Sequence, residues 1–301
     1  MIIKALEVSR EEEFLAFCRK HRDQLDDSFL SEEELERFKA DADNPTYIAV
    51  NSDGELAGAA SLMLNDYSRR GRKARLRILY AEPEAAGVYQ ELLQAVLLHA
   101  DGMDKLNIFV PTLNTELAGK LAGAGFEVER YSFLLVRGGQ EVPEFVLPGG
   151  YEIRPFKRGV DEASWCEVRN AGFAKLKGSE TPVTPEMVEN MTAGADSIEG
   201  GMLLLYHGSR AVGVVRGSAD EYKDRPLMNI GPLALLPEYQ GKGLGRILLR
   251  AALHTARDNG YGGTILCVNA ENDRAKALYI SEGFNEVEAA ACYRYVVPGA
   301  V

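Results

Sequence analysis

Residues 235–246 read Leu-Leu-Pro-Glu-Tyr-Gln-Gly-Lys-Gly-Leu-Gly-Arg, and an apolar run with helical spacing follows them directly. The stretch predicts the end of a strand, a loop rich in glycine and the start of a helix. Backbone N–H groups at a helix N-terminus bind phosphate, because the helix dipole favours negative charge and glycine lets a ligand come close. A phosphate-binding turn is one interpretation, and a flexible turn that opens an ordinary helix is the other.

The glycine spacing excludes two common phosphate loops. A P-loop requires glycine, four residues and then Gly-Lys-Ser/Thr, a spacing that neither Gly241 nor Gly243 begins. The dinucleotide-binding fingerprint requires G-x-G-x-x-G, whereas Gly241, Gly243 and Gly245 are spaced G-x-G-x-G. What stands here is Gln-x-x-Gly-x-Gly, formed by Gln240, Gly243 and Gly245. This signature resembles the coenzyme A pyrophosphate loop of the GNAT family, the GCN5-related N-acetyltransferases.

A second motif downstream supports the same resemblance. Residues 264–268 form a short apolar run that is typical of a strand. In the GNAT family the next segment reads Asn-x-x-Ala-x-x-Leu-Tyr and then Gly-Phe, and it marks a second helix beside the cofactor. The matching residues are Asn272, Ala275, Leu278, Tyr279, Gly283 and Phe284. Both motifs occur here in the family's order, about thirty residues apart, so the second half of the chain resembles a GNAT domain.

The composition is that of a globular protein with room for two domains. The chain has 301 residues, 46% of them hydrophobic, and contains no run of eighteen apolar residues, so we expect no membrane span. Its N-terminus lacks the pattern of a secretory signal. The cysteines are far apart, at Cys18, Cys166, Cys267 and Cys292. We therefore expect reduced thiols in the cytoplasm, and neither disulfides nor a metal site.

The net charge is −11, from 45 acidic against 34 basic residues. This balance argues against nucleic-acid binding, which needs a basic surface. It is compatible with attraction of a cationic amine, although an acidic excess serves solubility equally well.

The two halves of the sequence repeat one pattern. Residues 47–60 predict a hairpin with an Asp-Gly turn, and residues 202–215 repeat it. Amphipathic helices precede each hairpin, at 10–24 and 31–41 in the first half and at 161–173 and 184–193 in the second. A strand, an asparagine and a Gly-Phe pair also recur with equal spacing: 108–110, Asn114 and Gly125-Phe126, then 266–268, Asn272 and Gly283-Phe284.

We therefore predict an α+β fold, an α/β sandwich, made of two tandem GNAT-like domains. Each should contain a mixed, mostly antiparallel sheet flanked by helices. A degenerate domain is expected over 1–138, a linker rich in glycine and proline over 139–150, and the catalytic domain over 151–301. This layout resembles that of mycothiol synthase and related bacterial two-domain acetyltransferases.

The first domain departs from the second where the chemistry is expected. It is four residues shorter between Pro83 and the next strand, and it has one glycine, Gly87, in place of the loop. Leu121 stands at the position of Tyr279 and cannot transfer a proton. We interpret this domain as a copy that kept the fold and lost the catalytic site. It would support the second domain, shape the acceptor pocket or bind a ligand weakly.

The resemblance implies how the second half would hold acetyl-CoA. In the family, the strand before the loop is splayed from its neighbour, and the pantetheine arm lies against its free backbone groups. The Leu235 N–H is then the donor to the developing oxyanion. The loop would bind the diphosphate, mainly through its backbone. The residues expected to contact the cofactor are Leu233, Ala234, Leu235, Gln240, Gly241, Lys242, Gly243, Leu244, Gly245, Arg246, Asn272 and Lys276.

Tyr279 is the expected catalytic proton donor to the thiolate of coenzyme A. The unperturbed pKa of a phenol is about 10 and that of a thiol about 8.5, which suits this transfer. The alternative is a buried aromatic ring that caps the core. The general base stays open among Asp220, Glu221, Asp224 and Glu180, and water relays are common in the family.

The predicted function is transfer of an acetyl group from acetyl-CoA to the amine of a small-molecule acceptor, by direct attack on the thioester. A coenzyme A-binding sensor without catalysis is one alternative, and a peptide or protein N-acetyltransferase is another. Nucleic acid and membrane are not expected as partners. A monomer with pseudo-dimeric tandem domains and a homodimer both remain open.

Overall fold

The computed structural model describes residues 1–25, 27–139 and 141–299. Gln140, in the predicted linker, and residues 300–301, at the end of the predicted second domain, lie outside the described residues.

The chain folds into two compact units. Unit 1 contains Met1–Ser132 and Glu288–Val301, and unit 2 contains Phe133–Val287. Within the described residues, no helix is both long enough and apolar enough to cross a membrane.

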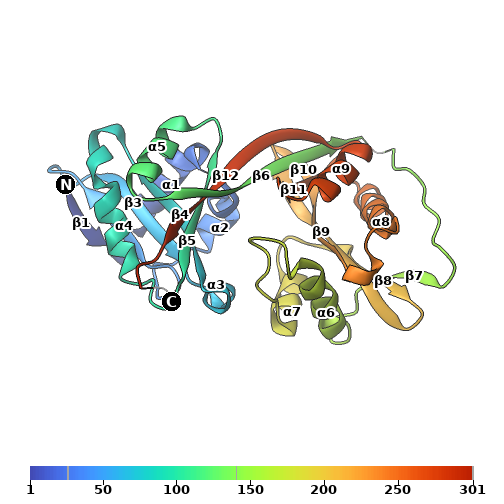
Figure 1. Cartoon of the computed structure of the whole chain (residues 1–301). Coiled ribbons are helices and arrows are strands. Elements are labelled where there is room, and N and C mark those ends of the chain that lie inside the picture. The colour runs from blue at the N-terminus through green and yellow to red at the C-terminus, as the bar shows by residue number, and fades with distance from the viewer. Residues whose placement is uncertain (26, 140, 300–301) are drawn as a thin grey trace. The chain divides into compact units, whose positions relative to one another are not determined.

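Unit 1 is a twisted sheet with helices packed on it (Figure 1). Neighbours from β1 to β4 are antiparallel, β4 and β5 are parallel, and β12 is antiparallel to β5. Its strands are β1 (Ile2–Ala5), β2 (Thr46–Val50), β3 (Leu56–Met63), β4 (Lys73–Ala81) and β5 (Lys105–Pro111). Its helices are α1 (Glu11–His21), α2 (Glu32–Glu36), α3 (Asp66–Gly71), α4 (Tyr89–Leu97) and α5 (Thr115–Gly123).

Unit 2 repeats this plan. Neighbours from β7 to β10 are antiparallel, and β10 and β11 are parallel. Its strands are β7 (Tyr151–Pro155), β8 (Ser197–His207), β9 (Arg210–Tyr222), β10 (Arg225–Leu235) and β11 (Gly263–Asn269). Its helices are α6 (Glu162–Phe173), α7 (Pro185–Ala193), α8 (Leu244–Asp258) and α9 (Asp273–Ser281). The predicted fold, two mixed and mostly antiparallel sheets flanked by helices, is confirmed.

The predicted hairpins form in both units. In β2–β3 the turn places Gly54 at φ +86°, and in β8–β9 the turn places Gly208 at φ +60°. Glycine adopts this left-handed backbone without steric cost, which explains its place in both turns.

Two long strands extend beyond the halves of the sequence to which they belong. In β6 (Glu127–Gly138), residues 133–138 belong to unit 2, where the strand lies next to β11. In β12 (Asn285–Val296), residues from 288 on belong to unit 1 and pair along β5, with Cys292 opposite Phe109. Each unit therefore takes its last strand from the other half of the sequence.

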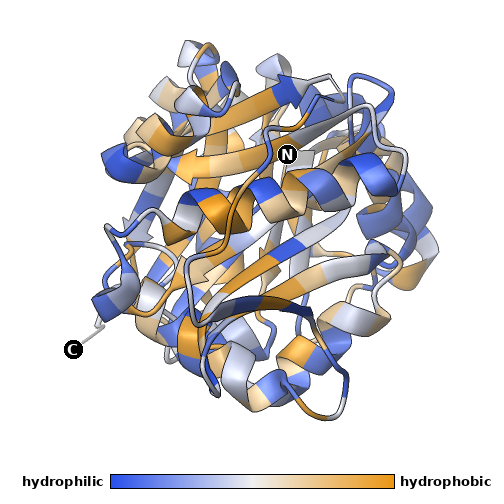
Figure 2. Cartoon of the chain, turned by 90° about the vertical axis from the view of Figure 1, so that its right-hand side faces the viewer, coloured by the Kyte–Doolittle hydropathy of each residue, from blue (hydrophilic) through white to orange (hydrophobic). Residues whose placement is uncertain are grey.

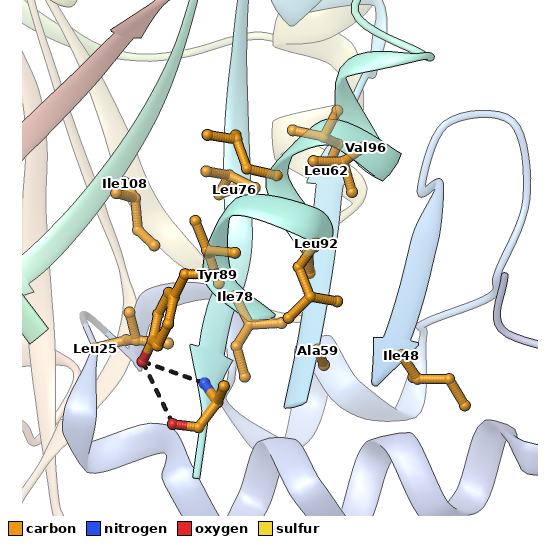
Figure 3. Packing of buried hydrophobic residues seen from close by; sticks show 14 of the residues in the cluster. Leu25, Ile48, Ala59, Leu62, Leu76, Ile78, Tyr89, Leu92, Val96 and Ile108 are labelled. Atoms are coloured by element: carbon orange, nitrogen blue, oxygen red, sulfur yellow. Dashed lines mark hydrogen bonds between the residues drawn. The ribbon is translucent and has the colours of Figure 1, made fainter. Parts of the chain in front are cut away.

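Helices cover both faces of each sheet. In unit 1 the core between the sheet and α4 contains fully buried aliphatic residues such as Ile78, Leu92 and Val96 (Figure 3). The helix ribbons carry hydrophobic and hydrophilic stretches in alternation, as expected for helices with one buried side (Figure 2).

The two parallel strands separate in each unit. The β4–β5 ladder ends at Arg75 and Asn107, although β4 continues to Ala81. The β10–β11 ladder ends at Asn229 and Ile265, although β10 continues to Leu235. Past these points the ladder does not pair the backbone groups on the facing edges of the two strands. We call the gap between β10 and β11 the slot, and it corresponds to the splayed strand that the family resemblance implied.

Candidate active site

The free edge of β10 begins at a bulge. The β9–β10 register shifts between Ile230 and Leu233, across Gly231 and Pro232, and proline has no N–H to donate to a ladder. Beyond the bulge, the Leu236 N–H donates to the Val212 carbonyl at 3.0 Å. Because antiparallel residues alternate between bonded and non-bonded pairs, the N–H groups of Leu233 and Leu235 point away from β9. They are therefore directed toward the slot between β10 and β11.

The glycine loop after β10 leaves the start of α8 open. A short 3₁₀ turn (Pro237–Tyr239) leads into Gly241 at φ +74° and Gly243 at φ +80°. Among the described residues, no side chain caps the start of α8, and a Cβ added at Gly241 or Gly243 would meet no atom within 4 Å. Uncapped N–H groups next to glycines without side chains are compatible with the diphosphate expected for this loop.

The polar side chains of the loop have partners within the protein. Gln240 Nε2 donates to the Leu235 carbonyl at 3.1 Å, so this side chain fixes the end of β10. The Lys242 ammonium lies 5.2 Å from the centre of the Tyr239 ring. Leu244 is buried, and Gly245 lies where a Cβ would come within 3.8 Å of the Leu235 side chain. The loop side chains thus mainly set the shape of the backbone.

Glu282 connects α8 and α9, although no sequence motif pointed to it. This buried carboxylate, just after α9, pairs with Arg246 and with Arg250 of α8, the latter at 2.8 Å. Burial opposes its ionisation, but Arg250 and Arg246 outweigh burial and hold the pKa of Glu282 below its ordinary value of 4.5. Arg246, expected at the cofactor, is therefore part of an ion pair that joins α8 to the residue after α9.

Tyr279 lies on α9, the helix on which the motif placed it. Its ring is partly buried and lies 5.9 Å from the Phe284 ring. The neighbouring Leu278 comes within 3.7 Å of a Cβ added at Gly245 in α8. Burial raises the pKa of Tyr279 to about 12. The phenol therefore keeps its proton at neutral pH and acts as a hydrogen-bond donor.

Asn272, the N-cap of α9, and Lys276, on α9, have partners within the protein. The Asn272 side chain caps the helix by accepting from the Ala275 N–H at 3.3 Å. The Lys276 ammonium pairs with Glu286 at 2.8 Å and lies 3.5 Å from the centre of the Phe133 ring. Both were expected to contact the cofactor, and both already hold α9 in place.

α6 covers the other face of β10. Successive strand residues point to opposite faces, and Ala234 faces α6 while the Leu235 side chain lies near α8. A Cβ added at Gly172 of α6 would lie 3.1 Å from the Ala234 methyl and 2.8 Å from the Leu235 carbonyl oxygen. No local sequence pattern indicates this contact, because it joins residues far apart in the chain.

The loop between α6 and α7 is fastened at three points. Asn170 exchanges two hydrogen bonds of 2.9 Å with the backbone of Val183. Arg169 donates to the Thr181 carbonyl at 2.6 Å, and Asn269, at the end of β11, donates to the Lys177 carbonyl at 2.9 Å. The loop is therefore held against the end of the slot.

The structure does not single out a general base. Of the candidates, Asp220 accepts from Asn229 at 2.8 Å near the β9–β10 turn, and Glu221 and Asp224 are exposed in the same region. Glu180 lies in the loop between α6 and α7. Among the described residues, no group of three or more His, Cys, Asp or Glu side chains is placed to hold a metal ion.

The sequence of this site matches a family model. Residues 171–284 match the model described as Acetyltransferase (GNAT) family, and this range runs from the end of α6 to just past α9. The chain carries a GNAT domain. The matched range includes the slot, the glycine loop and Tyr279, so the motifs that suggested the family lie within it.

Several curated relatives of this chain are named mycothiol acetyltransferases. A mycothiol acetyltransferase from Catenulispora acidiphila (strain DSM 44928) is 28% identical over 245 residues, which cover 80% of this chain and 77% of that protein. Other mycothiol acetyltransferases match about half of this chain and about half of their own length. On the evidence of the family match and these relatives, the chain is an N-acetyltransferase. Acetyl-CoA is the acyl donor of such enzymes.

Solved structures share the tandem fold. A GCN5-related N-acetyltransferase from Sphaerobacter thermophilus has a TM-score of 0.74 at 18% identity, covering 100% of this chain and 96% of that one. A tandem GNAT protein from the clavulanic acid biosynthesis pathway has a TM-score of 0.70 at 15% identity, covering 100% and 99%. At such low identity these neighbours show the fold of two GNAT units.

Proposed function

We propose that unit 2 transfers the acetyl group of acetyl-CoA to the amine of a small-molecule acceptor, in the cytoplasm and without a metal. The observation that carries the proposal is the stretch from Leu235 to Gly243. It joins a backbone N–H directed into the slot to an uncapped helix N-terminus a few residues later. An oxyanion donor and an anion-binding loop on one stretch of chain are what acyl transfer from a coenzyme A thioester needs.

The backbone performs most of the binding. Acetyl-CoA supplies the activated acetyl group. The N–H groups around Gly241 and Gly243 hold the diphosphate, and Lys242 adds positive charge. As the amine nitrogen bonds to the carbonyl carbon, negative charge develops on the oxygen, and the Leu235 N–H stabilises it. Loss of one such donor typically costs about 3 kcal/mol of barrier.

Tyr279 stabilises the leaving thiolate. With a pKa of about 12, its phenol is protonated at every pH at which the enzyme would work. Full transfer to a thiolate of pKa about 8.5 would be uphill, so the phenol donates a hydrogen bond to the sulfur. The proton that the amine loses leaves through water, and the thiolate is protonated from solvent.

The acceptor is a small amine. Relatives named mycothiol acetyltransferases support this class. The loop between α6 and α7 is fastened to α6 by Asn170 and to β11 by Asn269, which favours an enclosed acceptor over an extended peptide. The cytoplasm fits Cys18, Cys166, Cys267 and Cys292, which are all free thiols.

The test combines binding and turnover. The purified chain should bind one coenzyme A per molecule in isothermal titration calorimetry. It should release thiol from acetyl-CoA with at least one member of a panel of small amines, assayed next to a panel of peptide N-termini. Binding without thiol release on either panel would make the protein a sensor, and turnover on peptides alone would overturn the small-amine assignment.

A further inference from the structure

The part of β10 that carries the predicted oxyanion donor lacks one of its two strand neighbours. Among the described residues, the ladder with β11 ends at Asn229, six residues before Leu235. A donor works in an oxyanion hole only if it is already fixed in place before charge develops. Other contacts must therefore hold the Leu235 backbone.

α6 supplies such a contact through a glycine. A Cβ at Gly172 would lie 2.8 Å from the Leu235 oxygen and 3.4 Å from the Leu235 nitrogen. The first distance is shorter than any real Cβ contact, and both partners are backbone atoms that cannot rotate away. The absence of a side chain at Gly172 thus lets the helix backbone pack directly on the Leu235 backbone.

In unit 1 the corresponding helix and strand also face one another, but large side chains fill the contact. There His21 of α1 packs against Tyr80 of β4, with ring centres 4.6 Å apart and the rings tilted by 33°. Tyr80 immediately precedes Ala81, just as Ala234 immediately precedes Leu235 at the end of the equivalent strand. Unit 1 fills this contact with two rings, whereas unit 2 has a hydrogen and a methyl group.

We propose that Gly172 is a positioning residue for acyl transfer. Because it has no side chain, α6 packs closely against β10, and this contact fixes the Leu235 N–H at the reacting carbonyl. The proposal rests on the function proposed above. Gly172 would act through the backbone of Leu235 and not on the reacting atoms themselves. A misplacement of about 1 Å at a reacting centre can cost about 100-fold in rate, and an added Cβ would force a shift of that order.

The decisive variant is Gly172→Ala. Alanine favours helix over glycine, so on helix propensity alone this variant would be more stable than the wild type. We expect kcat to fall about 100-fold, while the KM for acetyl-CoA and the Kd of coenzyme A stay within threefold, because the glycine loop is intact. Hydrogen exchange of the 230–236 peptide should become faster. Gly119→Ala is the matched control, since Gly119 is an exposed helical glycine with no atom near its Cβ position, and it should keep full kcat.

The outcomes separate this inference from the proposed function. A Gly172→Ala enzyme with kcat within threefold of the wild type would overturn it, and so would a loss of kcat matched by an equal loss of coenzyme A affinity. If Gly172→Ala does not fold, Ala234→Val adds carbons to the same contact from the strand side. A fall in its kcat with a nearly unchanged KM supports the proposal, and an unchanged kcat overturns it. A wild type without transferase activity would refute the proposed function, and the exchange rate at 230–236 would still show whether Gly172 fixes this backbone.

Discussion

The two units share a fold but treat the slot between their parallel strands differently. In unit 1 the Tyr89 hydroxyl accepts from the Ala81 N–H at 3.2 Å and lies 3.4 Å from the Ala81 carbonyl, so a side chain occupies the end of β4 (Figure 3). In unit 2 the first turn of α8 carries Gly245, and the Leu235 N–H is directed toward the slot between β10 and β11. At the start of the helix after the splayed strand, unit 1 therefore has a tyrosine that binds the strand backbone, whereas unit 2 has a glycine.

The residues around the splayed strands also differ between the two units. The helix after β4 begins at Tyr89 behind a 3₁₀ turn (Pro83–Val88), whereas α8 begins behind glycines in left-handed conformation. Unit 1 has the apolar Ala124 before its Gly-Phe pair, and unit 2 has Glu282, which joins α8 to α9. The site can thus be lost through a few side chains while the sheet is preserved.

The largest expected effect is that of Tyr279→Phe. Removing the hydroxyl takes away the hydrogen bond to the thiolate, so kcat should fall by about 100- to 1,000-fold. The Kd of coenzyme A should be unchanged, because Tyr279 is not part of the diphosphate loop. Tyr80→Phe, which removes a partly buried phenol from unit 1, is the control and should keep kcat. Stopped-flow or steady-state thiol release measures both, and equal rates for wild type and Tyr279→Phe would remove the assignment.

Glu282→Gln tests the ion pair that only unit 2 has. Loss of the charge leaves Arg246 and Arg250 without their carboxylate, and the free energy of unfolding of unit 2 should fall by about 2 kcal/mol at pH 7. The figure is below that for a fully buried pair, because both arginines reach water.

The effect of Glu282→Gln should depend on pH in a defined direction. The folded pKa of Glu282 lies below 4.5, so its contribution is complete above about pH 4.5 and disappears as the pH falls through the folded pKa. Urea unfolding at a series of pH values measures this. Wild type and variant should converge in acid, and a constant difference down to pH 2 would contradict the ion-pair account.

Gly243→Ala should raise the KM for acetyl-CoA by about tenfold. Gly243 has φ +80°, a conformation that costs a residue with a side chain about 1 kcal/mol or more, so the loop would relax and its N–H groups would turn away. Gly87→Ala is the control in unit 1, where the added Cβ meets no atom within 4 Å. Steady-state kinetics with both variants distinguishes them, and an unchanged KM for Gly243→Ala would exclude the loop as the diphosphate site.

The parts of the molecule that local rules govern could be predicted from the sequence. The asparagines at 114 and 272 cap α5 and α9, glycines form the hairpin turns and the loop before α8, and the motif places Tyr279 on a helix. What could not be predicted depends on contacts between distant residues. Gly172 meets Leu235 across 63 positions, Glu282 meets Arg246 across 36, and β12 pairs with β5 from the other half of the sequence.

Tyr89→Phe has the smallest expected effect and tests the comparison most directly. The variant loses the hydroxyl bonds to Ala81 in a buried place, which should lower the free energy of unfolding by about 1 kcal/mol and the Tm by about 3 °C. Coenzyme A should still bind with a stoichiometry of one, because unit 1 also lacks the glycine loop. Calorimetric titration of variant and wild type measures both the affinity and the number of sites. A second coenzyme A bound by Tyr89→Phe would mean that the phenol alone closes the slot in unit 1, and that the glycine loop is not required for binding in either unit.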